Sequence, residues 1–192
     1  GDAGGDMYLT AGKGHGEDIS GGNIVLTAGE AHSGHAWSSG VGGDIKLSGG
    51  ESNLDLGGSL HFTSGYSAAT SSGDVHVSTA EAGSSGVSGL VDISTGNTSY
   101  GASGNVQLST GAAHEGAGGN ISLHVGTGDA GDGGYVHLRA GESTADSSAG
   151  GSIVLEGGKS INNDTYGAGQ GGSIVLESGE GVGGSGGDVK VS

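Results

Sequence analysis

A short unit that recurs twelve times constrains the fold of this chain more than any other feature of its sequence. The unit reads Gly, a residue that is usually small and polar, an apolar residue, any residue, and a second apolar residue. Short runs with apolar residues at alternate positions predict strands rather than helices. The first apolar positions are Met7, Ile24, Ile45, Leu60, Val75, Val91, Val106, Ile121, Val136, Ile153, Ile174 and Val189. The second apolar positions are Leu9, Leu26, Leu47, Phe62, Val77, Ile93, Leu108, Leu123, Leu138, Leu155, Leu176 and Val191.

The spacing of the units predicts how the strands are arranged. The sequence numbers of successive first apolar positions most often differ by 15, as from Leu60 to Val75, and the longer spacings include 17 and 21. Connections of this length exclude two-residue hairpins, and identical strands that present the same face favour parallel stacking. We therefore predict an all-β chain that forms a parallel β-solenoid (β-helix) of about twelve rungs. Its basic coil corresponds to the spacing of 15, its longer coils to those of 17 and 21, and its apolar pairs face inward.

Glycine brackets every unit. Gly stands two residues before the first apolar position in all twelve units, and five residues after it in ten of eleven, where Ala80 is the exception. Only Gly accepts a positive φ or a close backbone approach without strain. The pattern therefore predicts one of these two conditions at both ends of each strand.

The spacings form a longer repeat. The series 17, 21, 15 opens the chain and returns at an offset of 129 in sequence number, which aligns Met7 with Val136 and Trp37 with Tyr166. We expect residues 1–192 to form a single continuous domain that is part of a longer array with a 129-residue super-repeat.

Charge and composition narrow the set of partners. The chain has 21 acidic and 5 basic residues and a net charge of −16, which disfavours binding to nucleic acid. No apolar run approaches the roughly 18 residues of a membrane span, so membrane insertion is not expected. We expect no cofactor beyond diffuse binding of Ca²⁺ to the acidic surface, and no enzymatic motif stands in a suitable structural context.

Three residues are candidate metal ligands. In the predicted stack His61 and His76 occupy the same column on adjacent rungs, where they either share a transition metal or form a solvated polar face. No third ligand has a fixed spacing, which favours the polar face. Asp188 ends a Gly-Gly-x-Gly-x-Asp stretch that is similar to calcium-binding repeats, although those repeats recur every nine residues.

The longest coils and the sequons supply the other candidate residues. Trp37 and Tyr166 either anchor a lateral interface or cover a gap in their own thin core. Asn-x-Ser/Thr sequons make Asn97, Asn120 and Asn163 acceptors for N-glycosylation in a eukaryotic secretory route.

The Gly-Gly-Asp/Asn-Ile/Val-x-Leu unit resembles the glycine-rich β-solenoid repeats of extracellular fibres, found in bacterial adhesins, phage tail fibres, and surface proteins of algae and protists. The resemblance implies an extracellular location or a place on a cell or virion surface, and transfers no functional residue. We expect a structural protein whose copies join end to end or laterally into a filament. The alternatives are an adhesin or carbohydrate-binding fibre stalk that grips glycans, and an ice-binding protein.

Overall fold

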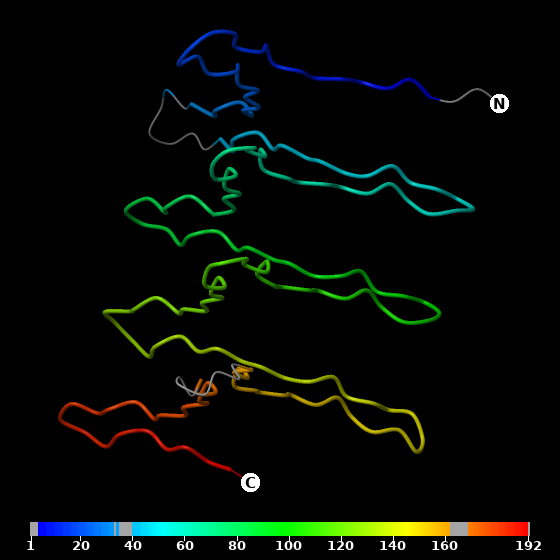
Figure 1. The fold of residues 1–192 in the computed structure, drawn as a ribbon. Coiled ribbons are helices and arrows are strands. Elements are labelled where there is room, and N and C mark those ends of the chain that lie inside the picture. Colours follow the sequence, from blue (N-terminus) through cyan, green and yellow to red (C-terminus); the bar gives the residue numbers. More distant parts are fainter. Residues whose placement is uncertain (1–3, 33, 35–39, 162–168, 192) are drawn as a thin grey trace. The chain divides into compact units, whose positions relative to one another are not determined.

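The twelve apolar segments do not form strands. The computed structural model describes residues 4–32, 34, 40–161 and 169–191. These residues contain neither helix nor strand (Figure 1). The predicted parallel β-solenoid is therefore wrong for this part of the chain. The predicted inward core is also absent there, because no described residue is buried.

The positions of the backbone hydrogen bonds explain why no sheet forms. A solenoid needs ladders of bonds between residues that lie one coil apart in sequence. In the described part of the chain, the bonds that join distant residues instead connect glycines 8 to 14 positions apart across a loop. Each such loop has one bond at its base, which closes the loop but does not build a ladder. Figure 1 shows the chain folding back at the loops in this way.

The segments around Ile45 and Val189 are locally extended, with polar side chains on the side opposite the apolar residue. In an extended chain, side chains two residues apart point to the same side. Lys46 Nζ lies 2.9 Å from Asp44 Oδ2, and Lys190 Nζ lies 3.6 Å from Asp188 Oδ2. Ile45 and Val189, which stand between the partners, therefore point to the other side.

Seven loops are closed by a main-chain hydrogen bond at their base. The N–H of the glycine that ends the loop donates to the carbonyl of the glycine that begins it, over 2.8 to 3.0 Å. We call these the closed loops and name them by their first and last residues. They are loops 12–22, 29–43, 50–58, 65–73, 141–151, 158–172 and 179–187.

The remaining four loops, which we call the open loops, have no such bond among their described residues. They are loops 80–89, 96–104, 111–119 and 126–134.

The residue immediately before a loop, which we call its neck residue, separates the two classes. Every closed loop has Ala, Gly or Ser at the neck, and every open loop has a β-branched residue. The closed necks are Ala11, Ala28, Gly49, Ser64, Ala140, Gly157 and Ser178, and the open necks are Thr79, Thr95, Thr110 and Val125.

The glycine that ends each loop faces different atoms in the two classes. A Cβ added to Gly58 or Gly151, in closed loops, would stand 2.9 or 3.1 Å from the backbone nitrogen of the first loop glycine. A Cβ added to Gly104 would instead meet the Thr95 Cγ2 methyl at 3.3 Å. A β-branched neck residue thus places a methyl group where the main chain approaches in a closed loop.

These observations decide between the two predicted roles of the bracketing glycines. The described residues with positive φ include Gly16, Gly101, Gly131 and Gly183, and none of these stands at the base of a loop. The glycines that end the closed loops therefore serve close approach of two backbone segments and not a left-handed conformation. The glycines that begin the loops, such as Gly12 and Gly50, meet neither condition, because an added Cβ would have nothing within 4 Å and their φ is not positive. The prediction for both ends of each segment is thus wrong at that end.

The offset of the super-repeat is visible in local conformation. Asp18 and Ser147 are equivalent positions under this offset, and both have a positive φ, 55° and 62° respectively. Loops 12–22, 29–43 and 50–58 match loops 141–151, 158–172 and 179–187 in the same way, and all six are closed. One super-repeat therefore contains four closed loops followed by four open loops. The chain divides into two units, Gly1–Ser94 and Thr95–Ser192.

Candidate functional site: an exposed apolar stripe

The twelve pairs of alternate apolar residues form the main exposed feature of the chain, and we call them the apolar stripe. Apart from Met7, the first residue of each pair is between 49% and 65% exposed, and the second residue is more exposed still, from 56% to 92%. An ordinary core buries such side chains almost completely. The stripe is thus partly covered by its own chain and remains accessible to another molecule.

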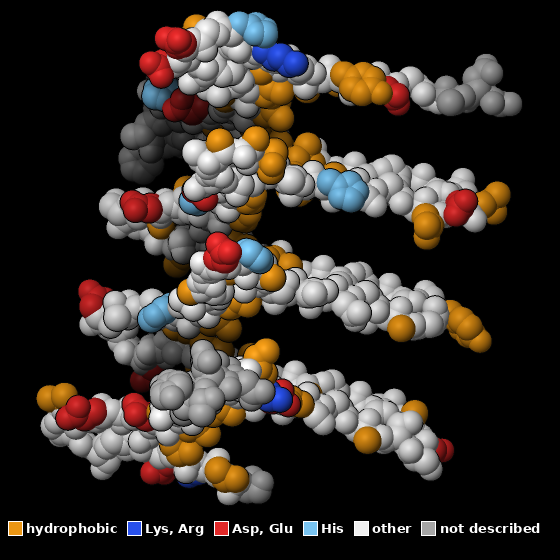
Figure 2. Space-filling model, viewed as in Figure 1, with side chains coloured by type: hydrophobic (Ala, Val, Ile, Leu, Met, Phe, Trp, Pro, Cys, Tyr) orange, Lys and Arg blue, Asp and Glu red, His pale blue; other side chains and the backbone are white. Residues whose placement is uncertain are grey.

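The stripe lies at the loop bases. Figure 2 shows hydrophobic side chains gathered where the loops begin and end, within each of the two units. This placement follows from the sequence, because an apolar pair begins two positions after the glycine that ends one loop and finishes three positions before the first residue of the next loop. Loop closure therefore brings successive apolar pairs toward each other without burying them.

A polar face accompanies the stripe on the opposite side of several segments, whereas Val25, Val154 and Val175 stand at the corresponding position of three others. Besides the two Asp–Lys pairs, Tyr8 Oη donates a hydrogen bond to Asp6 Oδ2 over 3.1 Å, and His76 Nε2 lies 3.8 Å from Asp74 Oδ2. The groups are strongly exposed, so each pair contributes little stability. Their value is geometric, since they keep the polar residues away from the apolar side.

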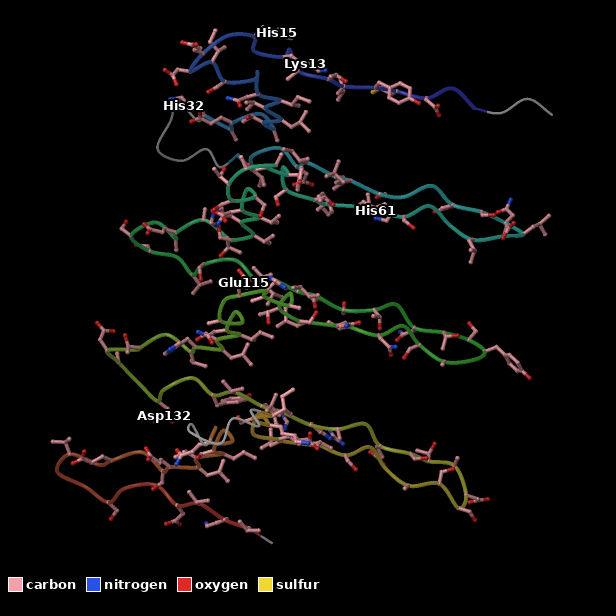
Figure 3. All side chains as sticks on the ribbon, viewed as in Figure 1. Lys13, His15, His32, His61, Glu115 and Asp132 are labelled. Carbon is pink, nitrogen blue, oxygen red and sulfur yellow. The ribbon has the colours of Figure 1, made fainter. Side chains whose placement is uncertain are left out.

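The structure places the candidate metal ligands on exposed segments of this surface. His61 lies on the segment that precedes loop 65–73 (Figure 3), and His76 pairs with Asp74. Asp188 pairs with Lys190. In residues 4–32, 34, 40–161 and 169–191, no three His, Asp or Glu side chains gather in a way that could hold a metal ion. Metal binding at these residues stays a prediction.

The remaining candidate residues fall partly outside the described chain. Trp37, Tyr166 and Asn163 lie outside the described residues. Asn97 is exposed on open loop 96–104, and Asn120 is exposed on the segment that follows open loop 111–119. Both sequons are accessible to modification, which stays a prediction.

Sequence reasoning missed several exposed side chains on the loops. Leu54 and Tyr100 are fully exposed, on loops 50–58 and 96–104. Thr98 positions Tyr100, because its Oγ1 donates to the Tyr100 carbonyl and accepts from the Tyr100 N–H, over 3.0 and 3.2 Å. The sequence feature that could have identified Leu54 and Tyr100 is an apolar or aromatic residue that stands between bracketing glycines and outside the repeated apolar pairs.

The described residues enclose no pocket, so the accessible features are the stripe, the polar face and the loops. Figure 3 shows charged side chains such as Glu115 and Asp132 on the open loops. The described part of the chain contains no helix that is long and apolar enough to span a membrane. The chemistry available on this surface is apolar contact and hydrogen bonding by exposed polar groups.

Comparison with known proteins yields no relative. No protein-family model matches the chain, and no curated protein or solved structure matches it either.

Proposed function

We propose that this chain is a structural, non-catalytic protein that associates with copies of itself into an extracellular or surface filament. The observation that carries the proposal is the exposure of the apolar stripe. Full burial of a Val, Leu or Ile side chain contributes about 1.5 to 3 kcal/mol, so roughly half of that remains available at each half-exposed position. Repeated over many pairs, this is a substantial driving force for association.

A second copy suits the stripe because the spacing of the apolar pairs is the same in both molecules. Contacts made by one pair then recur at the next pair, which allows lateral or staggered association along the chain. Ordering a chain of this length also costs conformational free energy that a buried core normally offsets. Association supplies apolar burial that the described residues lack within one copy.

Electron microscopy and sedimentation velocity of the full chain test this proposal. We expect filaments or large assemblies, and a lower assembled fraction for the triple variant Val91→Thr, Val106→Thr and Val136→Thr, which makes the stripe polar at nearly constant shape. The matched control is Val41→Thr, Val87→Thr and Val182→Thr, because these three valines are on loops and more than 90% exposed. The control should assemble like the parent chain. Dispersed single chains of the parent at every ionic strength would overturn the proposal.

An adhesin that binds glycans is a second candidate, favoured by the exposure of Tyr100. Exposed aromatic side chains on loops are suited to stacking and to hydrogen bonding through the Tyr hydroxyl. Glycan-array binding by the parent chain, lost in Tyr100→Ala but retained in Tyr66→Ala, would support this function. Absence of binding to any glycan would remove it.

A further inference from the structure

The charges of the chain oppose the association that its apolar stripe favours. The chain has 21 acidic residues against 5 basic ones. Three of the five already face a carboxylate of their own chain: Lys46 at 2.9 Å, Arg139 at 3.5 Å and Lys190 at 3.6 Å. At most two basic side chains, Lys13 and Lys159, are left to meet the carboxylates of a second copy. Complementary charge therefore does little to draw two copies together.

Carboxylates stand close to the apolar stripe. Asp74 precedes Val75, Asp92 lies between Val91 and Ile93, and all of these residues are exposed. Glu156 and Glu177 each follow the second apolar residue of a pair and are also exposed. Neighbouring residues of an extended chain are about 3.3 Å apart. These carboxylates point away from the apolar residues beside them, because side chains alternate along an extended chain. Two stripes in contact would still bring the carboxylates of the two copies closer together than about 30 Å, which is the screening distance at roughly 0.01 M salt.

We infer that ionic strength controls the association of this chain with copies of itself, because salt screens the carboxylates that flank the apolar stripe. The inference rests on the proposed self-association and adds its regulation. At low ionic strength the repulsion extends over about 30 Å and keeps copies apart, whereas at about 1 M it extends over about 3 Å. Apolar contact between stripes then prevails. Any cation serves, because the effect is screening and not coordination.

Sedimentation velocity of the full chain across NaCl concentrations from about 10 mM to about 1 M tests the inference. We expect the apparent association constant to rise by at least about tenfold across this range. A parallel series in CaCl₂, matched for ionic strength, should give nearly the same curve. A much stronger effect of CaCl₂ than of NaCl at equal ionic strength would overturn screening in favour of a bound cation.

Two variants of equal charge locate the effect. The stripe variant combines Asp74→Asn, Asp92→Asn, Glu156→Gln and Glu177→Gln, and changes the net charge from −16 to −12. The loop variant makes the same change in charge with Glu81→Gln, Asp129→Asn, Asp132→Asn and Glu180→Gln. We expect the stripe variant to assemble at a several-fold lower salt concentration than the loop variant. Equal shifts would overturn the role of the carboxylates beside the stripe.

The remaining outcomes separate this inference from the proposed function. Assembly that is equally strong at every salt concentration, or that weakens as salt rises, would overturn the inference and leave the proposed self-association intact. Absence of assembly at every salt concentration would overturn the proposed function itself. A rise in assembly with salt that is smaller in the triple variant Val91→Thr, Val106→Thr and Val136→Thr would support both.

Discussion

Loops 65–73 and 111–119 have the same length and the same bracketing glycines, yet only the first is closed by a main-chain hydrogen bond. The difference lies in their neck residues, Ser64 and Thr110. A single additional methyl group at the neck replaces the main-chain bond with a 3.5 Å hydrogen bond from Thr110 Oγ1 to the Gly119 carbonyl. Loop length and glycine content therefore permit closure, and the bulk of one side chain decides whether it occurs.

The largest effect should follow from a bulky neck residue in the closed loop 50–58. A Cβ added to Gly49 would collide with the carbonyl oxygen of Gly58. We expect Gly49→Val to break the bond from Gly58 N–H to Gly50 and to displace both ends of the loop, with at least about tenfold faster hydrogen exchange at Gly58. Thr79→Val is the control, because that neck is already β-branched. Unchanged exchange in Gly49→Val would contradict the steric explanation.

A smaller change should convert a closed loop into an open one. Ala140→Thr introduces a β-branched neck before loop 141–151, whose closing bond from Gly151 to Gly141 measures 2.9 Å. Loss of this bond removes about 1 kcal/mol of net stabilisation, so exchange of the Gly151 amide should accelerate about fivefold. NMR-detected hydrogen exchange measures this rate. Ala140→Ser should behave like the parent, since Ser occupies the neck of two closed loops.

The reverse substitution should close an open loop. In Thr110→Ala the methyl that keeps the two segments apart is removed, so the Gly119 N–H can donate to the Gly111 carbonyl. We expect exchange of the Gly119 amide to slow by about the same fivefold factor. Thr110→Ser should do the same, whereas Thr110→Val should leave the loop open. Slower exchange in the Val variant would be incompatible with the role assigned to side-chain bulk.

The smallest effect should come from the hydroxyl of an open neck. Thr95 Oγ1 donates to the Gly104 carbonyl over 3.4 Å, which is long for a hydrogen bond of this kind. Thr95→Val keeps the shape and removes the donor, so the free energy of unfolding should fall by no more than about 0.5 kcal/mol. A loss well above that value in chemical denaturation would show that the hydroxyl, rather than bulk, maintains the neck.

The sequence predicted part of this arrangement and misjudged the rest for a physical reason. Alternation at Asp44, Ile45 and Lys46 correctly implied an extended segment with polar and apolar sides. It could not show what lies against the apolar side, and for this reason a buried core and parallel rungs were wrongly predicted. The choice between main-chain bonds within a loop and bonds between coils depends on the whole chain. A periodic pattern in the sequence is compatible with both.

The sequence predicted the candidate site less completely than it predicted the repeat. The apolar pairs were identified, but their exposure of about half or more emerged only from the structure. The contrast between Ala or Ser and Thr or Val at the neck was present in the sequence. That this contrast separates closed loops from open loops became clear only from the backbone atoms that the final glycine of each loop approaches.

Loop closure also has a mechanical consequence. Each closed loop stores a length of chain between two glycines held together at its base, and at about 3.3 Å per residue this is roughly 25 to 45 Å of contour length. Under tension along the chain, we expect open loops to lengthen first and closed loops to yield at higher force, when their glycine bonds break. A filament built from such chains would soften in two stages, with compliant and stiff stretches alternating along each super-repeat.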